Sequence, residues 1–132
     1  MKLRVYLVED SAIMSPVLRT LIEAAGAKIV GNSGAAWTAI GDIEVLRPDV
    51  VIIDIGLREG SGFDVLKSLF HAQGTGGPVR MVLTNHALEP YRKAAKRWGA
   101  AHFFDKSTQI PEMLGVLRDM RRSLQAGTSA KT

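Results

Sequence analysis

The chain has 132 residues, of which 46% are hydrophobic and 23% are charged, and it contains no cysteine. This length fits one domain, the apolar fraction excludes a disordered chain, and the lack of cysteine excludes a disulfide framework, a thiolate zinc site and a cysteine nucleophile. No apolar run approaches the ~18 residues of a membrane span, and residues 1–4 lead directly into a strand-like segment. We therefore expect a cytoplasmic protein that does not contact the membrane.

The formal net charge of +4 is unevenly distributed along the chain. Residues 1–60 contain 6 Lys or Arg and 8 Asp or Glu, whereas residues 61–132 contain 11 and 5, a net charge of +6. A basic half would suit a nucleic-acid surface. Neither interleaved aromatic residues nor a recognition motif accompanies these charges, so we expect a basic helical surface that faces a protein partner, and no direct nucleic-acid binding.

Strand-like and helical periodicities alternate along the whole chain. Residues 3–8 form the first β-type run, and a helix with apolar residues at helical spacing is expected to begin near Ala12 and to end at Gly26. Pro16 lies about one turn inside, where it is tolerated if no internal hydrogen bond is lost. The remaining strands are expected over residues 27–31, 50–53, 79–83 and 101–104. The remaining helices are expected over residues 38–46, 63–70, 88–98 and 110–124.

Residues 50–53 are four consecutive β-branched residues, which is typical of a parallel strand buried on both faces. Five βα units predict an α/β fold, a doubly wound (βα)5 three-layer sandwich around a parallel five-stranded sheet. We assign residues 1–124 to this domain. Residues 125–132 have linker composition and are expected to form a flexible C-terminal tail.

Polar residues follow four of the five strands. Glu9 and Asp10 follow the first strand, Asp54 the third, Thr84 the fourth and Lys106 the fifth. In doubly wound folds, ligands bind beyond the carboxyl ends of the strands. Three carboxylates there would repel one another unless a cation lay among them, and oxygen ligands with room for water suit Mg²⁺. A lysine and a hydroxyl at the same edge suit a phosphoryl group.

Taken singly, each of these residues has a simpler interpretation. Glu9 could be a surface acid, and Asp10 could cap a helix. Asp54 could be a turn residue, Thr84 could simply end a strand, and Lys106 could be solvated.

Together, however, the residues resemble the receiver domains of two-component response regulators, and the resemblance covers nearly the whole chain. The matching positions are Glu9 and Asp10, Asp54 after the run 50–53, Gly62 eight residues later, Thr84, and Lys106 with Phe103 three residues before it. The resemblance implies a flavodoxin-like sheet with the strand order 2-1-3-4-5.

In this family, the residue that matches Asp54 accepts a phosphoryl group from the phosphohistidine of a histidine kinase. By the resemblance, Asp10 and Asp54 would bind Mg²⁺ directly, Glu9 would act largely through water, and the backbone carbonyl of Gly56 would complete the protein's share. Gly56 has no side chain to shield the phosphorus, and His86 lies two residues after Thr84. In the family both positions lie beside the acyl phosphate, so we expect both residues to influence the lifetime of the phosphoryl group.

The resemblance also implies how the signal would be passed on. Thr84 would hydrogen-bond the acyl phosphate, Lys106 would pair with it, and Phe103 would be the switch aromatic. The chain would be a phosphorylation-activated switch rather than an enzyme, with a sensor histidine kinase or phosphotransfer protein upstream and a downstream protein or a missing output domain as its target. Phosphorylation would change the face formed by helix 88–98, strand 101–104 and helix 110–124, which could also carry a homodimer.

That face is rich in basic residues, which are Arg92, Lys93, Lys96, Arg97, Arg118, Arg121 and Arg122. A basic face favours an acidic partner and association that weakens with salt. Trp37 and Trp98 are expected to be core or partly buried residues.

Three departures from the family pattern keep other functions open. Arg58 and Ser107 stand where proline is usual in the family, and the proline that matches Ser107 is commonly in a cis bond. Asn85 stands where a small residue is common. The alternative is a pseudo-receiver, an interaction module that is never phosphorylated. A flavodoxin-type electron carrier would need a phosphate-binding loop in place of residues 9–11, and an aspartyl phosphatase would need a second acid two residues after Asp54.

Overall fold

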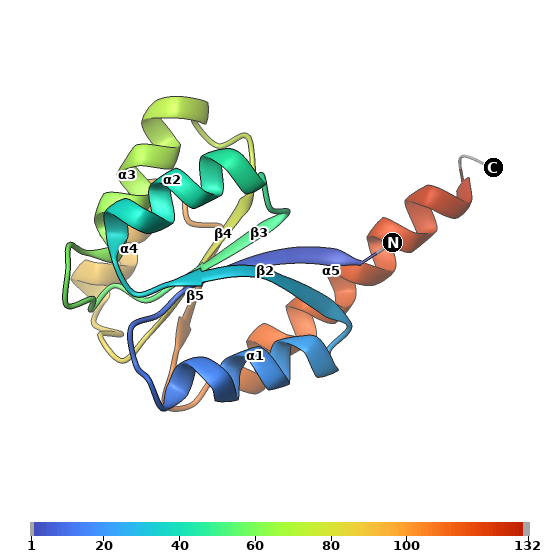
Figure 1. The fold of residues 1–132 in the computed structure, drawn as a ribbon, viewed down its shortest axis with the longest axis horizontal. Coiled ribbons are helices and arrows are strands. Elements are labelled where there is room, and N and C mark those ends of the chain that lie inside the picture. Colours follow the sequence, from blue (N-terminus) through green and yellow to red (C-terminus); the bar gives the residue numbers. More distant parts are fainter. Residues whose placement is uncertain (1, 131–132) are drawn as a thin grey trace.

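The computed structural model describes residues 2–130, with side chains described for residues 2–126. Five parallel strands form one sheet in the order β2-β1-β3-β4-β5 (Figure 1). The strands are β1 (Leu3–Val8), β2 (Ala27–Ser33), β3 (Val50–Ile53), β4 (Val79–Thr84) and β5 (His102–Asp105). The helices are α1 (Met14–Ala24), α2 (Ala36–Leu46), α3 (Gly62–Gln73), α4 (Glu89–Arg97) and α5 (Ile110–Ala130). The predicted α/β class, parallel sheet and strand order are confirmed.

Helices cover both faces of the sheet, so two apolar cores result. On β1, Val5 and Leu7 pack in the core that α1 and α5 cover, whereas Tyr6 and Val8 pack in the core that α2, α3 and α4 cover. Every residue of β3 is buried, as the β-branched run predicts. Each large apolar side chain buried in this way contributes about 1.5–3 kcal/mol to the free energy of folding. The central strands therefore give firm support to the residues at their carboxyl ends.

The first helix starts later than expected, at Met14, but its hydrogen bonding reaches back to the predicted start. The Ser11 hydroxyl accepts from the Met14 N–H at 3.0 Å, and the Ser11 carbonyl accepts from the Ser15 N–H at 2.9 Å. Pro16 therefore lies in the first turn, where its missing N–H removes little.

The C-terminal helix is longer than expected. Helical backbone continues to Ala130 instead of ending near Leu124, so it includes residues 125–130 of the expected tail. Gln125 and Ala126 are good helix formers, and extending an existing helix costs much less than nucleating one. Residues 131–132 of the expected tail lie outside the described residues. Figure 1 shows that this helix extends well beyond the sheet.

Tyr6 and Arg80 carry polar groups that are buried away from the carboxyl ends of the strands, and both donate hydrogen bonds. The Tyr6 hydroxyl donates to Asp42 Oδ2 at 2.6 Å, and burial together with this carboxylate raises the pKa of Tyr6 far above its usual value. The Arg80 guanidinium donates to the carbonyls of Gly74 and Gly76, each at 2.9 Å. Arg80 therefore fixes the glycine-rich loop between α3 and β4, and burial lowers its pKa.

The two tryptophans differ in their surroundings. Trp98 is partly buried against the Phe70 ring, with centroids 5.7 Å apart. Trp37 is 67% exposed, contrary to expectation, because α2 packs on the sheet through Ala36, Ala39 and Ile43 and turns Trp37 outward. Among the described helices, none combines the length and the apolar character that crossing a bilayer requires.

Candidate functional site

The polar residues that follow the strands lie at one edge of the sheet because the strands end in register there. Val8, the last residue of β1, is paired with Ile53, the last residue of β3. The Asp54 N–H donates to the Val8 carbonyl at 2.9 Å, and the Lys106 N–H donates to the Thr84 carbonyl at 2.9 Å. The backbone ladder therefore continues one residue beyond the strands and places these side chains together.

Asp54 is at the centre of this arrangement, 8% exposed, and accepts hydrogen bonds from three directions. Its Oδ1 accepts from Thr84 Oγ1 at 2.8 Å and from the Gly56 N–H at 3.1 Å. Its Oδ2 accepts from Lys106 Nζ at 2.7 Å. Because the donors belong to three separate segments, they fix the orientation of the carboxylate.

Lys106 bridges two buried acids. Its Nζ lies 2.5 Å from Glu9 Oε1 and 2.7 Å from Asp54 Oδ2, and its side chain is only 7% exposed. Burial acts to lower the pKa of Lys106, but the hydrogen bonds and charges of Asp54 and Glu9 outweigh it and raise the pKa above its usual value. The side chain is therefore an ammonium, which supplies positive charge beside Asp54.

Asp10 does not join this cluster, although the three carboxylates were expected to converge. Its Oδ2 accepts from the Arg58 N–H at 2.7 Å, so the carboxylate is tied to the loop between β3 and α3. Among the side chains described, residues 2–126, no group of three or more acidic, histidine or cysteine residues has the spacing of a metal site. The Lys106 ammonium lies between Glu9 and Asp54 and offsets the repulsion between their charges.

The start of α3 packs closely against the backbone of Asp54 and Ile55, because Gly62 has no side chain. A Cβ at Gly62 would overlap the Asp54 carbonyl oxygen and would lie 2.8 Å from the Ile55 Cα. Instead, the Gly62 N–H donates to the Ile55 carbonyl at 3.0 Å. Ser61 then begins α3 with a capping box, in which its hydroxyl accepts from the Phe63 N–H and the Asp64 side chain accepts from the Ser61 N–H.

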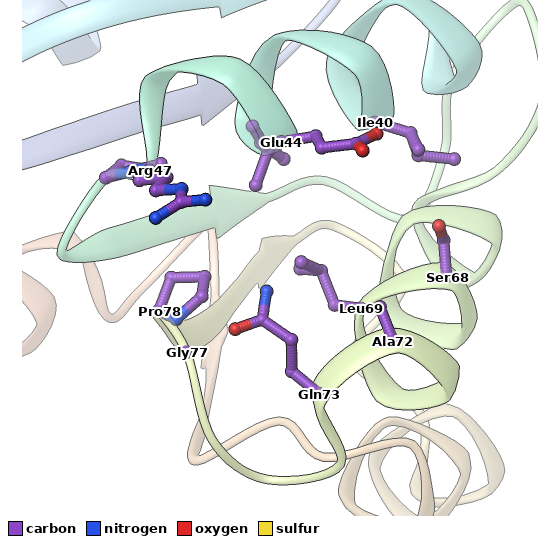
Figure 2. Close-up of a pocket in the computed structure, with 11 residues that line it drawn as sticks. Ile40, Glu44, Arg47, Ser68, Leu69, Ala72, Gln73, Gly77 and Pro78 are labelled. Carbon is purple, nitrogen blue, oxygen red and sulfur yellow. The ribbon is translucent and has the colours of Figure 1, made fainter.

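One cavity lies beside this cluster, and another lies far from it. A cavity of about 370 Å³ adjoins Asp10 and is lined by Ser15, Asn32, Arg58 and Glu59. A larger one, about 620 Å³, lies between α2 and α3 (Figure 2). Arg47, Pro48 and Pro78 line it, and they precede β3 and β4, so this cavity is at the opposite end of the sheet from Asp54.

Comparison with known sequences decides the family. The sequence profile of the response regulator receiver domain matches residues 5–118. The chain belongs to the response regulator receiver family. Receiver domains are parts of two-component systems, and switching by phosphorylation and binding of Mg²⁺ are general to them.

Individual relatives agree with this family. The chain is 27% identical over 128 residues to a protein-glutamate methylesterase/protein-glutamine glutaminase of Archaeoglobus fulgidus, covering 96% of this chain and 36% of the relative. It is 29% identical over 125 residues to the KDP operon transcriptional regulatory protein KdpE of Escherichia coli, covering 95% of this chain and 54% of the relative. The chain thus spans about a third and about half of these relatives, and their names assign it no activity.

Solved structures show the same fold. The response regulator domain of Thermotoga maritima CheB superposes with a TM-score of 0.80 at 25% identity, covering 90% of this chain and 96% of that one. A chain of the CheX–CheY–BeF3–Mg complex from Borrelia burgdorferi gives a TM-score of 0.74 at 18% identity, covering 86% and 87%.

The expected switch aromatic of this receiver, Phe103, has a partner that the sequence did not predict. The Arg92 guanidinium lies over the Phe103 ring, with Cζ 4.7 Å from the centroid. Arg92 also donates to the Ala87 carbonyl at 3.3 Å and to the Phe103 carbonyl at 3.5 Å. Arg92 thus joins the loop after β4 to β5, whereas the sequence placed it among the solvated basic residues. No local pattern marks this contact, because the two residues lie eleven positions apart on different elements.

His86 lies beside Gly56, the residue two positions after Asp54. A Cβ at Gly56 would lie 2.7 Å from His86 Nε2 and 4.0 Å from Asp54 Oδ1, so the imidazole stands where a side chain at residue 56 would project. The imidazole packs edge-on against the Tyr91 ring, with 6.0 Å between the centroids. The bond between Lys106 and Ser107 is trans, which leaves the family's usual cis bond absent at this position.

Proposed function

We propose that Asp54 accepts a phosphoryl group from the phosphohistidine of a sensor histidine kinase or a phosphotransfer protein, and that the chain thereby acts as a signalling switch. The observation that carries the proposal is the set of three donors on Asp54, from Thr84, Lys106 and Gly56. In the transfer, an Asp54 oxygen forms a bond to phosphorus, the phosphorus–nitrogen bond breaks, and the imidazole leaves with the electron pair.

The side chains around Asp54 have separate parts in this transfer. The Lys106 ammonium, already in contact with the carboxylate, would neutralise charge on the phosphoryl oxygens. The Thr84 hydroxyl would donate to one of those oxygens once it releases Asp54 Oδ1. Positioning and charge compensation account for most of the catalysis of phosphoryl transfer.

The oxygen donors present suit Mg²⁺, which when bound would neutralise negative charge on the transferring group. Asp10 and Asp54 would be its direct ligands, Glu9 would act through water, and the Gly56 carbonyl would complete the set. Asp10 can take this part if its carboxylate exchanges the Arg58 N–H for the metal. Arg58 is highly exposed, with 82% of its side chain accessible, so its loop can move without disturbing a core.

The same contact favours a second candidate function, the pseudo-receiver. If the Arg58 N–H holds Asp10 permanently, the chain would bind partners without being phosphorylated. One experiment separates the two: incubation with acetyl phosphate and Mg²⁺, followed by intact-mass measurement. Phosphorylation adds ~80 Da, one phosphoryl group, and this adduct should disappear with EDTA and in Asp54→Asn but persist in Asp119→Asn. A chain that never gains the adduct would be a pseudo-receiver.

We further propose that phosphorylation acts on the surface of α4, β5 and α5, through movement of Thr84 and Phe103. Lys93, Lys96 and Arg97 are exposed on α4, so an acidic partner or output domain fits this surface better than a second copy with the same charges. Arg121 contributes less than expected, since its side chain lies against Gly26 at the end of α1. We retain residues 1–124 as the proposed extent of the receiver unit.

A further inference from the structure

Helix α2 presents an apolar stripe to solvent. Trp37 is 67% exposed and Val45 is 81% exposed. Gly41 lies midway between them, and a spacing of four residues places all three on one side of the helix. Single exposed apolar residues are ordinary on protein surfaces. An exposed tryptophan and an exposed valine in one stripe are unusual, because the solvent-facing side of a surface helix is usually polar.

Gly41 is not explained by the isolated chain. Glycine weakens a helix interior relative to alanine, and Gly41 has no positive φ that would require it. A Cβ at this position would meet no atom within 4 Å. A Cβ at Gly115 in α5 would also meet no atom within 4 Å, but the residues four positions away are Pro111 and Asp119, so no pair of large apolar side chains flanks it. At Gly41 the missing side chain opens a path for a second backbone between two apolar groups.

The exposed side of α2 is complementary to itself. The side is centred on Gly41, with Trp37 and Val45 four positions away and Thr38 and Glu44 three positions away, all exposed. A two-fold axis through Gly41, perpendicular to the helix, would place Trp37 against the Val45 of a second copy, and the Thr38 hydroxyl against its Glu44 carboxylate. Such pairing repeats every contact twice, as a symmetric dimer requires.

We propose that α2 is the interface of a symmetric homodimer, in which two α2 helices pack antiparallel across Gly41. A second copy fits better than an unrelated partner because each exposed group meets a suitable group in the same stripe. On α4, by contrast, a second copy would bring Lys93, Lys96 and Arg97 against like charges. Towards α3 the stripe ends at Glu44, which lines the cavity between the two helices (Figure 2).

The small size of the stripe favours a weak dimer. Helix α2 has 11 residues and is about 16 Å long, and one helix face buries less than the ~1,600 Å² of a standard complex. We therefore expect a reversible dimer with a dissociation constant on the order of 10–100 μM.

Cysteine crosslinking tests the axis directly, since the chain contains no cysteine of its own. At about 100 μM chain under mild oxidation, Gly41→Cys should form a disulfide-linked dimer, because the axis brings residue 41 against itself. Val45→Cys alone should crosslink far less, whereas a mixture of Val45→Cys and Trp37→Cys should give the mixed dimer. Gly115→Cys is the matched control at an equally open helical glycine. Equal or greater crosslinking at Gly115 than at Gly41 would overturn the proposal.

Sedimentation equilibrium of the unaltered chain gives a second, independent measurement. The mean mass should rise with concentration and should return to that of a monomer in Val45→Arg, whereas Leu88→Arg, at a residue 66% exposed elsewhere, should still dimerise. A chain that stays monomeric at several hundred μM, about tenfold above the expected constant, would refute the dimer. Acetyl phosphate labelling of Val45→Arg should be unchanged, so failure of the dimer and failure of the Asp54 switch can be told apart.

Discussion

Replacing Lys106 by methionine removes the positive charge that separates two buried carboxylates. Glu9 is 3% exposed and Asp54 is 8% exposed. With Lys106 Nζ 2.5 Å from one acid and 2.7 Å from the other, the two nearest carboxylate oxygens are at most about 5 Å apart. At that separation and an effective dielectric constant of about 20, two negative charges repel by about 3 kcal/mol. We expect Lys106→Met to lower the free energy of unfolding by about 3 kcal/mol at pH 7.5, the range found when one partner of a buried ion pair is removed.

The pH dependence of this loss follows from its cause. In the unaltered chain, burial acts to lower the pKa of Lys106, but the hydrogen bonds and charges of Asp54 and Glu9 raise it above its usual value. The stability that the ammonium contributes is therefore fully present up to the usual pKa of a lysine and is lost only as pH rises through the raised pKa. Urea unfolding followed by circular dichroism at pH 7.5 should show the full loss in Lys106→Met. Millimolar Mg²⁺ should restore part of the stability at pH 7.5, since a divalent cation can replace the ammonium.

Two comparisons make this prediction specific. Lys96→Met removes a lysine from an exposed position and should change the free energy of unfolding by no more than about 0.5 kcal/mol. In the double variant Glu9→Gln with Lys106→Met, most of the loss should be recovered, because the remaining acid no longer faces a like charge. If Lys106→Met is as stable as the unaltered chain at pH 7.5, the charge bridge does not hold the edge together and the reasoning fails.

Three further predictions concern other parts of the molecule. Gly56→Ala places a Cβ against His86 Nε2, so both Gly56→Ala and His86→Ala should change the decay rate of phosphorylated chain, measured by intact mass, by about twofold or more. Lys96→Glu should weaken binding of an acidic partner and flatten its salt dependence while leaving acetyl phosphate labelling intact. Tyr6→Phe should lower the free energy of unfolding by about 1.5–3 kcal/mol, because the Asp42 carboxylate loses its buried donor.

Each of these has a matched control. Asn85→Ala changes an exposed neighbour of His86 and should leave the decay rate unaltered; decay rates indistinguishable in all three variants would remove the proposed role of the imidazole. Lys28→Glu reverses an exposed charge on β2 and should not affect partner binding, so equal loss in both lysine variants would mean that only net charge matters. Tyr91→Phe keeps its aromatic packing and should change the free energy of unfolding only slightly. If Tyr6→Phe changes it equally little, the hydrogen bond from Tyr6 to Asp42 does not stabilise the fold.

The sequence by itself determined the fold and the composition of the site. Alternating periodicities and the β-branched run at residues 50–53 are local patterns, and a parallel five-stranded sheet is the arrangement that buries them. Polar residues directly after the strands meet at one edge because parallel strands end together. Asp54, Thr84 and Lys106 could therefore be assigned to one site, and the structure places them in contact.

Only the tertiary structure decided which partner each side chain contacts. Lys106 lies 97 positions from Glu9 along the chain, yet it bridges Glu9 and Asp54, while Asp10 turns to the backbone of Arg58. Three further features also depend on the tertiary structure: the contact of Arg92 with Phe103, the outward direction of Trp37 on α2, and the continuation of α5 to Ala130. The physical reason is that local sequence specifies backbone preference and side-chain type. The direction in which a side chain points depends on how a helix is rotated against the sheet, and that rotation is set by the packing of residues distant in the chain.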